Sequence, residues 1–296
     1  MTAALEGGPL AARSGGLRRR VVDRLATVLL GVCVLIALAP LASVLYFTLV
    51  KGLTRFGGYF LQHSMRGVGP IDATGGAYHA IIGTLEQVGI ATLLAVPLGL
   101  LAAVYTVEYG RGSLASTIRF FTDVMTGVPS IVAGLFIYAF WVLALGQGFS
   151  GFAAALALAI LMLPTIVRVA EEMLKLVPDA LREASLALGV ARWRTILSIV
   201  LPTASAGIIT GVMLAVARVA GETAPLLLTA LNFDAINVNP FSGQQAALPT
   251  FVFAQAGAPQ RVALDRAWAG ALTLVLLILV LSLIARAIAR RSRVRA

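Results

Sequence analysis

The chain has 296 residues, of which 59% are hydrophobic and 12% are charged, and its mean hydropathy is +0.93. This composition excludes an ordinary soluble domain and is typical of a protein with several membrane-spanning helices. The net charge of +10 is carried almost wholly by arginine, so binding to nucleic acid has to be weighed against an uneven distribution of arginine across a membrane.

The first apolar run follows an arginine-rich tail, residues 1–24, and covers residues 25–50. A helix needs about 20 residues to cross the bilayer core, so this run is long enough. A cleavable signal peptide is the alternative, because three arginines precede the run and Ala37-Leu38-Ala39 resembles a cleavage site. The run is too long for a signal core, so we predict a retained helix, followed by an external glycine-rich segment at 51–77.

Five further apolar runs have the length of a span. The charge-free stretch 124–167 is twice as long as one span, and turn-forming residues at 146–151 divide it into two helices. The stretch 235–260 also lacks charge, but its Asn, Gln, Gly and Pro residues predict a loop. Spans two to six are therefore expected at about Tyr78–Val107, Phe121–Leu145, Phe152–Leu176, Leu201–Ala230 and Ala267–Ala289.

The basic residues indicate the orientation of these six spans. Sixteen lysines and arginines fall on the side of the two termini, and five fall on the opposite side. Since basic residues favour the cytoplasmic side, we predict cytoplasmic termini in a multi-pass cell (inner) membrane protein, with a basic tail at 290–296 and an external loop at 232–265. The excess charge then reflects topology and contact with membrane lipid, and we expect no nucleic-acid partner.

One long connection, residues 177–200, joins the fourth and fifth spans. Pro178 suits the first turn of a short helix, Ala184 and Ser185 are small enough for another surface to approach, and Gly189 permits a sharp change of direction. A helix–turn–helix lying on the inner leaflet and a docking element for another protein are both consistent with these features.

The spacing within this connection is specific. Glu183-Ala184-Ser185 is followed after three residues by Gly189, and after nine more by Ile199 and, one residue later, Leu201-Pro202. This spacing resembles the EAA loop of ABC importer permeases throughout, with Ser185 where alanine is usual. In that family the loop forms coupling helices that sit in a groove of a cytoplasmic ATPase. The resemblance implies an all-α type I importer fold with six transmembrane helices, and an ATPase contact that includes Glu183, Ala184, Ser185 and Gly189.

A second motif, RVAGETAPLLLT at Arg218–Thr229, resembles the signature of the phosphate-transport permeases of the PstA type. Shorter segments at 83–85, 97–109 and 128–136 support this resemblance, which covers a permease core of five helices at 78–289. It implies half of a pore for inorganic phosphate. It also implies a related permease of the PstC type, two copies of a cytoplasmic ATPase and an external phosphate-binding protein as partners. The loop 232–265 is either a docking surface for that protein or a simple connection.

The chain lacks the residues for nucleotide or metal chemistry. Neither lysine is followed by Ser or Thr, so no G-x-x-x-x-G-K-[ST] loop is present, and ATP with its magnesium is expected on the partner ATPase. The single cysteine, Cys33, excludes an internal disulfide, and His63 and His79 are too isolated for a zinc motif. We expect a transport subunit with no cofactor or metal of its own, not an enzyme.

Two arginines lie inside predicted spans. Arg218 precedes Glu222 by one helical turn, and Arg168 precedes Glu171 and Glu172. A charge in the middle of a span costs about 2.5 to 3.5 kcal/mol, so it needs a reason. We interpret both arginines as lining the phosphate path, because the guanidinium binds phosphate oxygens in a bidentate manner, with the glutamates as resting partners. The alternative is a set of structural ion pairs that lock helices together.

Two other functions remain open. A permease of the same fold could carry another oxyanion, such as sulfate or molybdate. An ion-coupled secondary transporter would be built from inverted repeats with helices broken at mid-membrane, but we find no convincing internal repeat.

Overall fold

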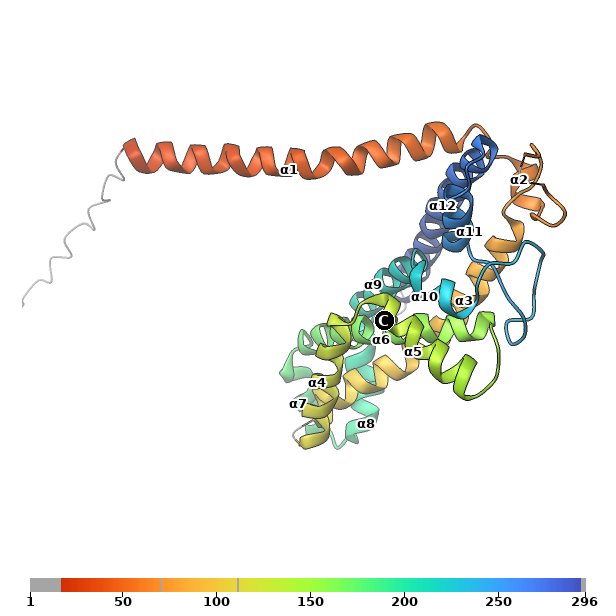
Figure 1. The fold of residues 1–296 in the computed structure, drawn as a ribbon. Helices are drawn as coiled ribbons and strands as arrows, with labels where there is room; N and C mark the ends of the chain where they lie inside the picture. Colours follow the sequence, from red (N-terminus) through yellow and green to blue (C-terminus); the bar gives the residue numbers. More distant parts are fainter. Residues whose placement is uncertain (1–16, 70, 111, 294–296) are drawn as a thin grey trace, which may run out of the picture. The chain divides into compact units, whose positions relative to one another are not determined.

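The computed structural model describes residues 17–69, 71–110 and 112–293, and every regular element in these ranges is a helix (Figure 1). The first sixteen residues of the predicted tail 1–24 and the last three of the basic tail 290–296 lie outside the described residues, as does Arg111. Contacts divide the chain into one unit that ends at Phe47 and another that begins at Thr48. Helix α1, Leu17–Gly52, begins in the first unit, and all other elements belong to the second.

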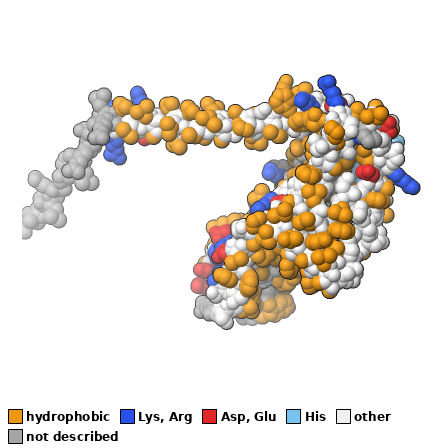
Figure 2. Space-filling model, in the orientation of Figure 1, with side chains coloured by type: hydrophobic (Ala, Val, Ile, Leu, Met, Phe, Trp, Pro, Cys, Tyr) orange, Lys and Arg blue, Asp and Glu red, His pale blue; other side chains and the backbone are white. Residues whose placement is uncertain are grey.

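Within the described residues, five helices are long and apolar enough to cross a membrane, or six if one bent pair counts as a single span. This agrees with the six spans predicted from the sequence. Hydrophobic side chains cover most of the visible face of these helices (Figure 2). Besides α1, the straight candidates are α3, Tyr78–Val104, with its π-helical continuation η1, Tyr105–Tyr109; α6, Gly151–Lys175; α9, Leu201–Val219; and α12, Arg261–Arg293.

The third predicted span is broken. Helix α4, Ser113–Gly127, and helix α5, Ser130–Ile137, meet at an angle of 108°, and α5 continues as the π-helical η2, Tyr138–Ala144. The break lies at Val128-Pro129, where Val128 has ψ 126°. Proline disfavours helical backbone in the residue before it, so the prediction of one straight helix over 121–145 was wrong for a local reason.

The fifth predicted span also divides into two pieces. Helix α9 ends at Val219, and a short helix, α10, begins at Ala224 and ends at Thr229, with Pro225 in its first turn. Helices α10 and α5 pack so closely that a Cβ atom on Gly134 would lie 2.5 Å from the Cα of Pro225. The prediction of a single helix over 201–230 was therefore wrong. The second pieces of the two broken spans, α5 and α10, pack on each other.

The predicted loop 235–260 contains a helix as well. Helix α11, Leu248–Ala256, follows an irregular segment at 231–247, and its apolar residues, such as Phe251 and Val252, pack beside α12. A second short helix, α2, Gly58–Gln62, lies in the segment between α1 and α3. Residues 245–251 of this charge-free stretch are buried, which the loop prediction missed.

The long connection contains helix α7, Asp179–Ala187, and helix α8, Arg192–Thr195, followed by the π-helical η3, Ile196–Val200, which leads into α9. In Figure 1, α7 and α8 lie at one end of the helical body, called here the α7 end, and α2 and α11 lie at the other. Helices α3, α6 and α9 form the centre, where small buried residues such as Ala91, Ala95, Ala154 and Ala155 allow the backbones to approach closely.

Candidate functional site

Arg218 lies near the end of α9, and its side chain is exposed. Gly207 faces Met173 and Gly211 faces Val169, so α6 and α9 run antiparallel. Seven residues separate Arg218 from Gly211, a rise of about 10 Å, which places Arg218 level with the middle of α6. The arginine therefore lies at mid-height of a membrane-length helix.

The predicted pair of Arg218 and Glu222 is not formed. The two residues share a helical face only if the helix continues, and α9 ends at Val219. Glu222 lies in the following turn, where its N–H donates to the carbonyl of Val219 at 3.1 Å. Among the described residues, neither Arg218 nor Glu222 makes an ion pair. Arg218 is therefore available to a ligand.

Arg168 has a partner that differs from the predicted ones. Its guanidinium pairs with the carboxylate of Asp123 on α4, and the two side chains are 46% and 53% exposed. Glu172 pairs instead with Lys175, at 3.6 Å, while Glu171 points into the bundle. The predicted pairs on α6 were wrong because Asp123, on another helix, reaches the exposed side of Arg168.

Glu171 belongs to a buried cluster. Its carboxylate accepts a hydrogen bond from the hydroxyl of Thr106 at 2.5 Å and lies 3.8 Å from Nε of Arg119. Nη2 of Arg119 also donates to the carbonyl of Thr106, at 2.8 Å. The side chain of Glu171 is only 3% exposed, so its charge is compensated inside the protein.

Two residues further along η1, Glu108 forms a second buried pair. Its Oε1 accepts from Nε of Arg182 at 3.1 Å and lies 3.0 Å from Nη2. The same guanidinium donates to the carbonyl groups of Val177 at 2.6 Å and Leu174 at 2.8 Å, which end α6, and to Asp179 at 3.0 Å. We name the whole set the polar seam: Thr106, Glu108, Arg119, Glu171 and Arg182.

The predicted ATPase-contact residues divide into exposed and buried ones. Glu183 and Ala184 are exposed on α7, beside the apolar Leu188, which is 84% exposed. Ser185 is buried, and its hydroxyl lies 2.8 Å from that of Thr195 on α8. Ser185 thus joins α7 to α8, and its expected place on the contact surface was wrong.

Gly189 ends α7 in a left-handed conformation, with φ +77°. Its N–H donates to the carbonyl of Leu186 at 2.9 Å, and the N–H of Val190 donates to that of Ser185 at 3.2 Å, which together form a Schellman motif. A Cβ atom there would meet no other atom within 4 Å. Glycine is needed for its backbone angle, and space for a side chain is not the constraint.

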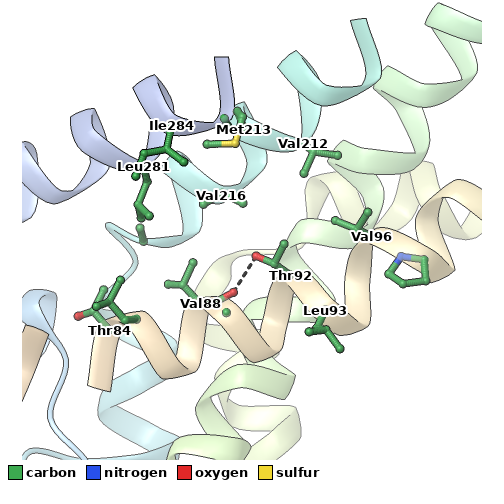
Figure 3. Close-up of a pocket in the computed structure, with 15 residues that line it drawn as sticks. Thr84, Val88, Thr92, Leu93, Val96, Val212, Met213, Val216, Leu281 and Ile284 are labelled. Atoms are coloured by element: carbon green, nitrogen blue, oxygen red, sulfur yellow. Dashed lines mark hydrogen bonds between the residues drawn. The ribbon is translucent and has the colours of Figure 1, made fainter. Parts of the chain in front are cut away.

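A large cavity lies between α3, α9 and α12, but its chemistry does not suit an anion (Figure 3). It has a volume of about 600 Å³ and walls that are nearly all aliphatic. The hydroxyl of Thr92 is bonded to the carbonyl of Val88 at 2.7 Å, and that of Thr84 to Ala80 at 2.8 Å. With no charged group in its lining, the cavity suits hydrocarbon and lies outside the candidate phosphate path.

The irregular segment 231–247 is held in one shape by amide side chains. Asn237 donates to the carbonyl groups of Ser242 at 2.9 Å and Gln244 at 3.0 Å. The buried Gln245 reaches between helices to accept from Gln87 at 3.1 Å. Phe241 is 66% exposed on the outside of this segment. A fixed loop that exposes apolar side chains is suited to contact with another protein.

Sequence reasoning missed Asp123, Thr106 and Glu108. Asp123 was visible as a carboxylate at the start of a charge-free run, and Glu108 as one at the end of an apolar span. Arg119 and Arg182 were counted only as basic residues near the membrane. Because all these contacts join different helices, no spacing within one helix could indicate them.

The helix arrangement resembles that of known transporters. A chain of a bacterial ABC transporter involved in the import of the acidic polysaccharide alginate superposes with a TM-score of 0.63, at 14% identity, over 92% of this chain and 98% of that one. A chain of the MetNI methionine ABC transporter superposes with a TM-score of 0.56, at 19% identity, over 73% of this chain and 94% of its own. At such low identity these matches establish the fold alone.

Sequence comparison establishes the family. Residues 95–294 match the family described as binding-protein-dependent transport system inner membrane component. Phosphate transport system permease protein PstA 1 of Mycobacterium tuberculosis H37Rv is 46% identical over 291 residues, which are 96% of this chain and 94% of that protein. PstA of Yersinia pestis is 42% identical over 271 residues, 91% and 90% of the two chains.

These matches agree with the apolar helices that make the chain a multi-pass membrane protein. The chain belongs to the inner membrane components of binding-protein-dependent transport systems and, within them, to the PstA permeases.

Proposed function

We propose that this chain is the permease subunit of an ATP-driven importer and forms half of a membrane pore for inorganic phosphate. It is a transport subunit and not an enzyme. The relatives described as phosphate transport permeases, which match nearly the whole chain, support the choice of substrate. The observation that carries the mechanism is the position of Arg218, which is exposed at mid-height and has no ion pair among the described residues.

Arg218 and Arg168, the path arginines, would bind phosphate in turn. A dianion needs fixed positive charge where water is scarce, and a guanidinium offers two parallel donors to phosphate oxygens. Arg168 lies seven residues before Lys175, about 10 Å from the α7 end of α6, so the two arginines lie at different depths. Asp123 takes the part of resting partner to Arg168, while Glu222 lies in the turn that follows Arg218.

The partners follow from the same assignment. The α7 end faces the cytoplasm, where the exposed Glu183 and Ala184 meet an ATPase that holds ATP and magnesium. A related permease of the PstC type completes the pore, with two copies of the ATPase below. The segment 231–247 lies outside and contacts the phosphate-binding protein through exposed residues such as Phe241.

Cysteine labelling tests this orientation. With Cys33 replaced, a cysteine at the exposed Ser242 should react with an impermeant thiol reagent in intact cells, and one at the exposed Ala184 should react only after lysis. Ala184 is the proper reporter because Ser185 is buried. The reverse pattern would invert the assignment.

Uptake tests the function itself. Cells that lack their own subunit of this kind, and that express this chain with its partner proteins, should take up radiolabelled phosphate. Uptake of sulfate or molybdate instead of phosphate would leave the permease intact but assign it another oxyanion.

The two broken spans give one reason to test an ion-coupled secondary transporter as well, since discontinuous helices at mid-membrane are typical of that class. Such a transporter would lose uptake when an ionophore removes the ion gradient. The importer should keep uptake under the ionophore and lose it on depletion of ATP.

A further inference from the structure

Passage of phosphate along the path arginines does not require the two carboxylates of the polar seam. Nevertheless, Glu108 is 6% exposed and Glu171 is 2% exposed. Burying ionised groups carries a large desolvation cost, and apolar residues would often pack as well or better. Fold stability alone is therefore a poor account of the polar seam.

Arg182 connects α7 rigidly to the part of the polar seam that lies nearest to it. All three of its guanidinium nitrogens have acceptors: on η1, on the last turn of α6 and the connection just after it, and on α7 itself. Moving α7 alone would leave the carboxylate of Glu108 buried without its partner, which is strongly unfavourable. Helix α7 and η1 must therefore move together.

Helix α8 holds the same turn from a second direction. Arg192 donates to the backbone carbonyl of Glu108 and lies over the ring of Tyr109 at 5.0 Å. The hydrogen bond between Ser185 and Thr195 joins α8 to α7. The two short helices are therefore joined to each other as one unit, and both are bonded to η1.

The helices that leave this unit both contain a π-helical turn next to it. Helix α3 ends in η1, and α9 is preceded by η3. Such turns are rare and are found frequently at functional sites. Bending where η1 joins α3 and where η3 joins α9 would let this unit move while α3 and α9 remain helical.

The inner part of the polar seam adjoins a path arginine. Glu171 follows Arg168 by three residues on α6, and Arg119 precedes Asp123 by four residues on α4. Both members of the Arg168–Asp123 pair are thus one helical turn from a member of the polar seam. A displacement of η1 that moves Thr106 would act on α4 and α6 at the level of that pair.

We propose that Glu108 and Arg182 are positioning residues that transmit movement of α7 through the polar seam to the Arg168–Asp123 pair. The proposal rests on the proposed function, in which an ATPase moves α7. Chains of hydrogen bonds and ion pairs are a physical carrier of such coupling, and direct measurement of the coupling is the proper test.

The experiment uses the complete complex in proteoliposomes with the phosphate-binding protein and inorganic phosphate. It measures phosphate molecules transported per ATP hydrolysed in each assembled complex. Glu108→Gln keeps the shape of the side chain but removes its charge, and Arg182→Lys keeps the charge but loses the fork. We expect assembly and ATP hydrolysis to persist in both variants. The number of phosphate molecules transported per ATP hydrolysed should fall by roughly 2- to 30-fold.

Asp179→Asn is the matched control. Asp179 bonds to the same guanidinium, but from the solvent side, and is 88% exposed. Its variant should keep the ratio of the unmodified complex.

A purely structural polar seam gives a different result. It would lower the amount of assembled complex and leave the ratio unchanged, and that outcome in Glu108→Gln and Arg182→Lys would overturn the proposal. Failure of both variants to assemble would also assign the polar seam to folding. If the unmodified complex hydrolyses ATP but moves no phosphate, the proposed function fails first and this inference fails with it.

Discussion

The polar seam and the path arginines contain the same residue types in contrasting settings. In the polar seam, Glu108 and Glu171 are buried, and each lies against an arginine. In the path, Arg168 and Arg218 are exposed; Asp123, the partner of Arg168, is itself 53% exposed. A buried charge that loses its partner costs several kcal/mol, about 3 to 5, whereas an exposed pair contributes about 0 to 1 kcal/mol.

This difference explains what each region can do. The Glu108–Arg182 pair, in which the side chains are 6% and 17% exposed, is costly to open and is suited to transmit position. An exposed arginine can exchange one anionic partner for another at little cost. The following substitutions test whether burial separates the two roles.

Replacing Arg218 should have the largest effect. Arg218→Gln removes the only charge offered at that depth of α9, and a hydrogen bond to a charged group contributes about 1.5 to 3 kcal/mol, so phosphate uptake should fall by roughly 10- to 150-fold. Arg218→Lys keeps the charge but loses the forked geometry of the guanidinium, so its phosphate uptake should lie between that of Arg218→Gln and that of the unmodified protein.

Glu222→Gln is the control for Arg218, because the two residues form no ion pair. It should insert, assemble and transport with at most a small loss. Equal losses in Arg218→Gln and Glu222→Gln would mean that the two residues act as a pair, against the observed geometry.

Gly189 should show the next largest effect, through its backbone. Any residue with a Cβ atom destabilises the left-handed backbone at φ +77° by about 1 to 2 kcal/mol, whatever the size of its side chain. Gly189→Ala should therefore impair assembly with the ATPase almost as much as Gly189→Trp, while Gly189→Asn, which tolerates this conformation, should be milder. Co-purification of the ATPase measures all three. A normal Ala variant with a defective Trp variant would mean that the size of the side chain, and not the backbone angle, is the constraint at this position.

The sequence predicted the apolar helices well because membrane spans depend on length and hydropathy, which are properties of single segments. The helix predictions failed where a local backbone effect or a tertiary contact determined the structure. Pro129 breaks the third span and Pro225 starts α10 after the fifth has ended. The stretch that contains α11 was predicted to be a loop from its Asn, Gln, Gly and Pro residues, but the neutral polar Thr250 finds its partners inside the protein, at the backbone of Ala247.

The candidate site shows the same limit. Spacing along a helix correctly selected Arg168 and Arg218 as charges that need a reason, but it assigned them the wrong partners. Asp123 lies on another helix, and the break after Val219 separates Arg218 from Glu222. In the connection 177–200, the motif could not indicate that Ser185 faces inward while Ala184 faces outward.

Asp123→Asn should have a smaller effect, and its effect on the KM for uptake distinguishes two roles of the Arg168–Asp123 pair. If Asp123 competes with phosphate for Arg168, its loss should lower the KM for uptake by up to about fivefold, the value of an exposed ion pair. If the pair instead braces α4 against α6, the variant should be less stable at unchanged KM. Glu172→Gln, which breaks the exposed pair with Lys175 on the same helix, is the control and should not change KM.

Ser185→Ala should have the smallest effect. It removes the hydrogen bond to Thr195, whose hydroxyl keeps the carbonyl of Ala191 at 3.4 Å as an acceptor, so no buried group is left without a partner. The expected loss is about 0.5 to 1.5 kcal/mol of stability, visible as a lower unfolding temperature of the purified complex, with uptake per complex unchanged. Ala187→Ser, which adds a hydroxyl at an exposed position of the same helix outside the proposed ATPase contact, should change neither quantity. If Ser185→Ala lowered uptake per complex and left the unfolding temperature unchanged, Ser185 would have to meet the ATPase directly, and the division of α7 into a buried side and a contact side would be wrong.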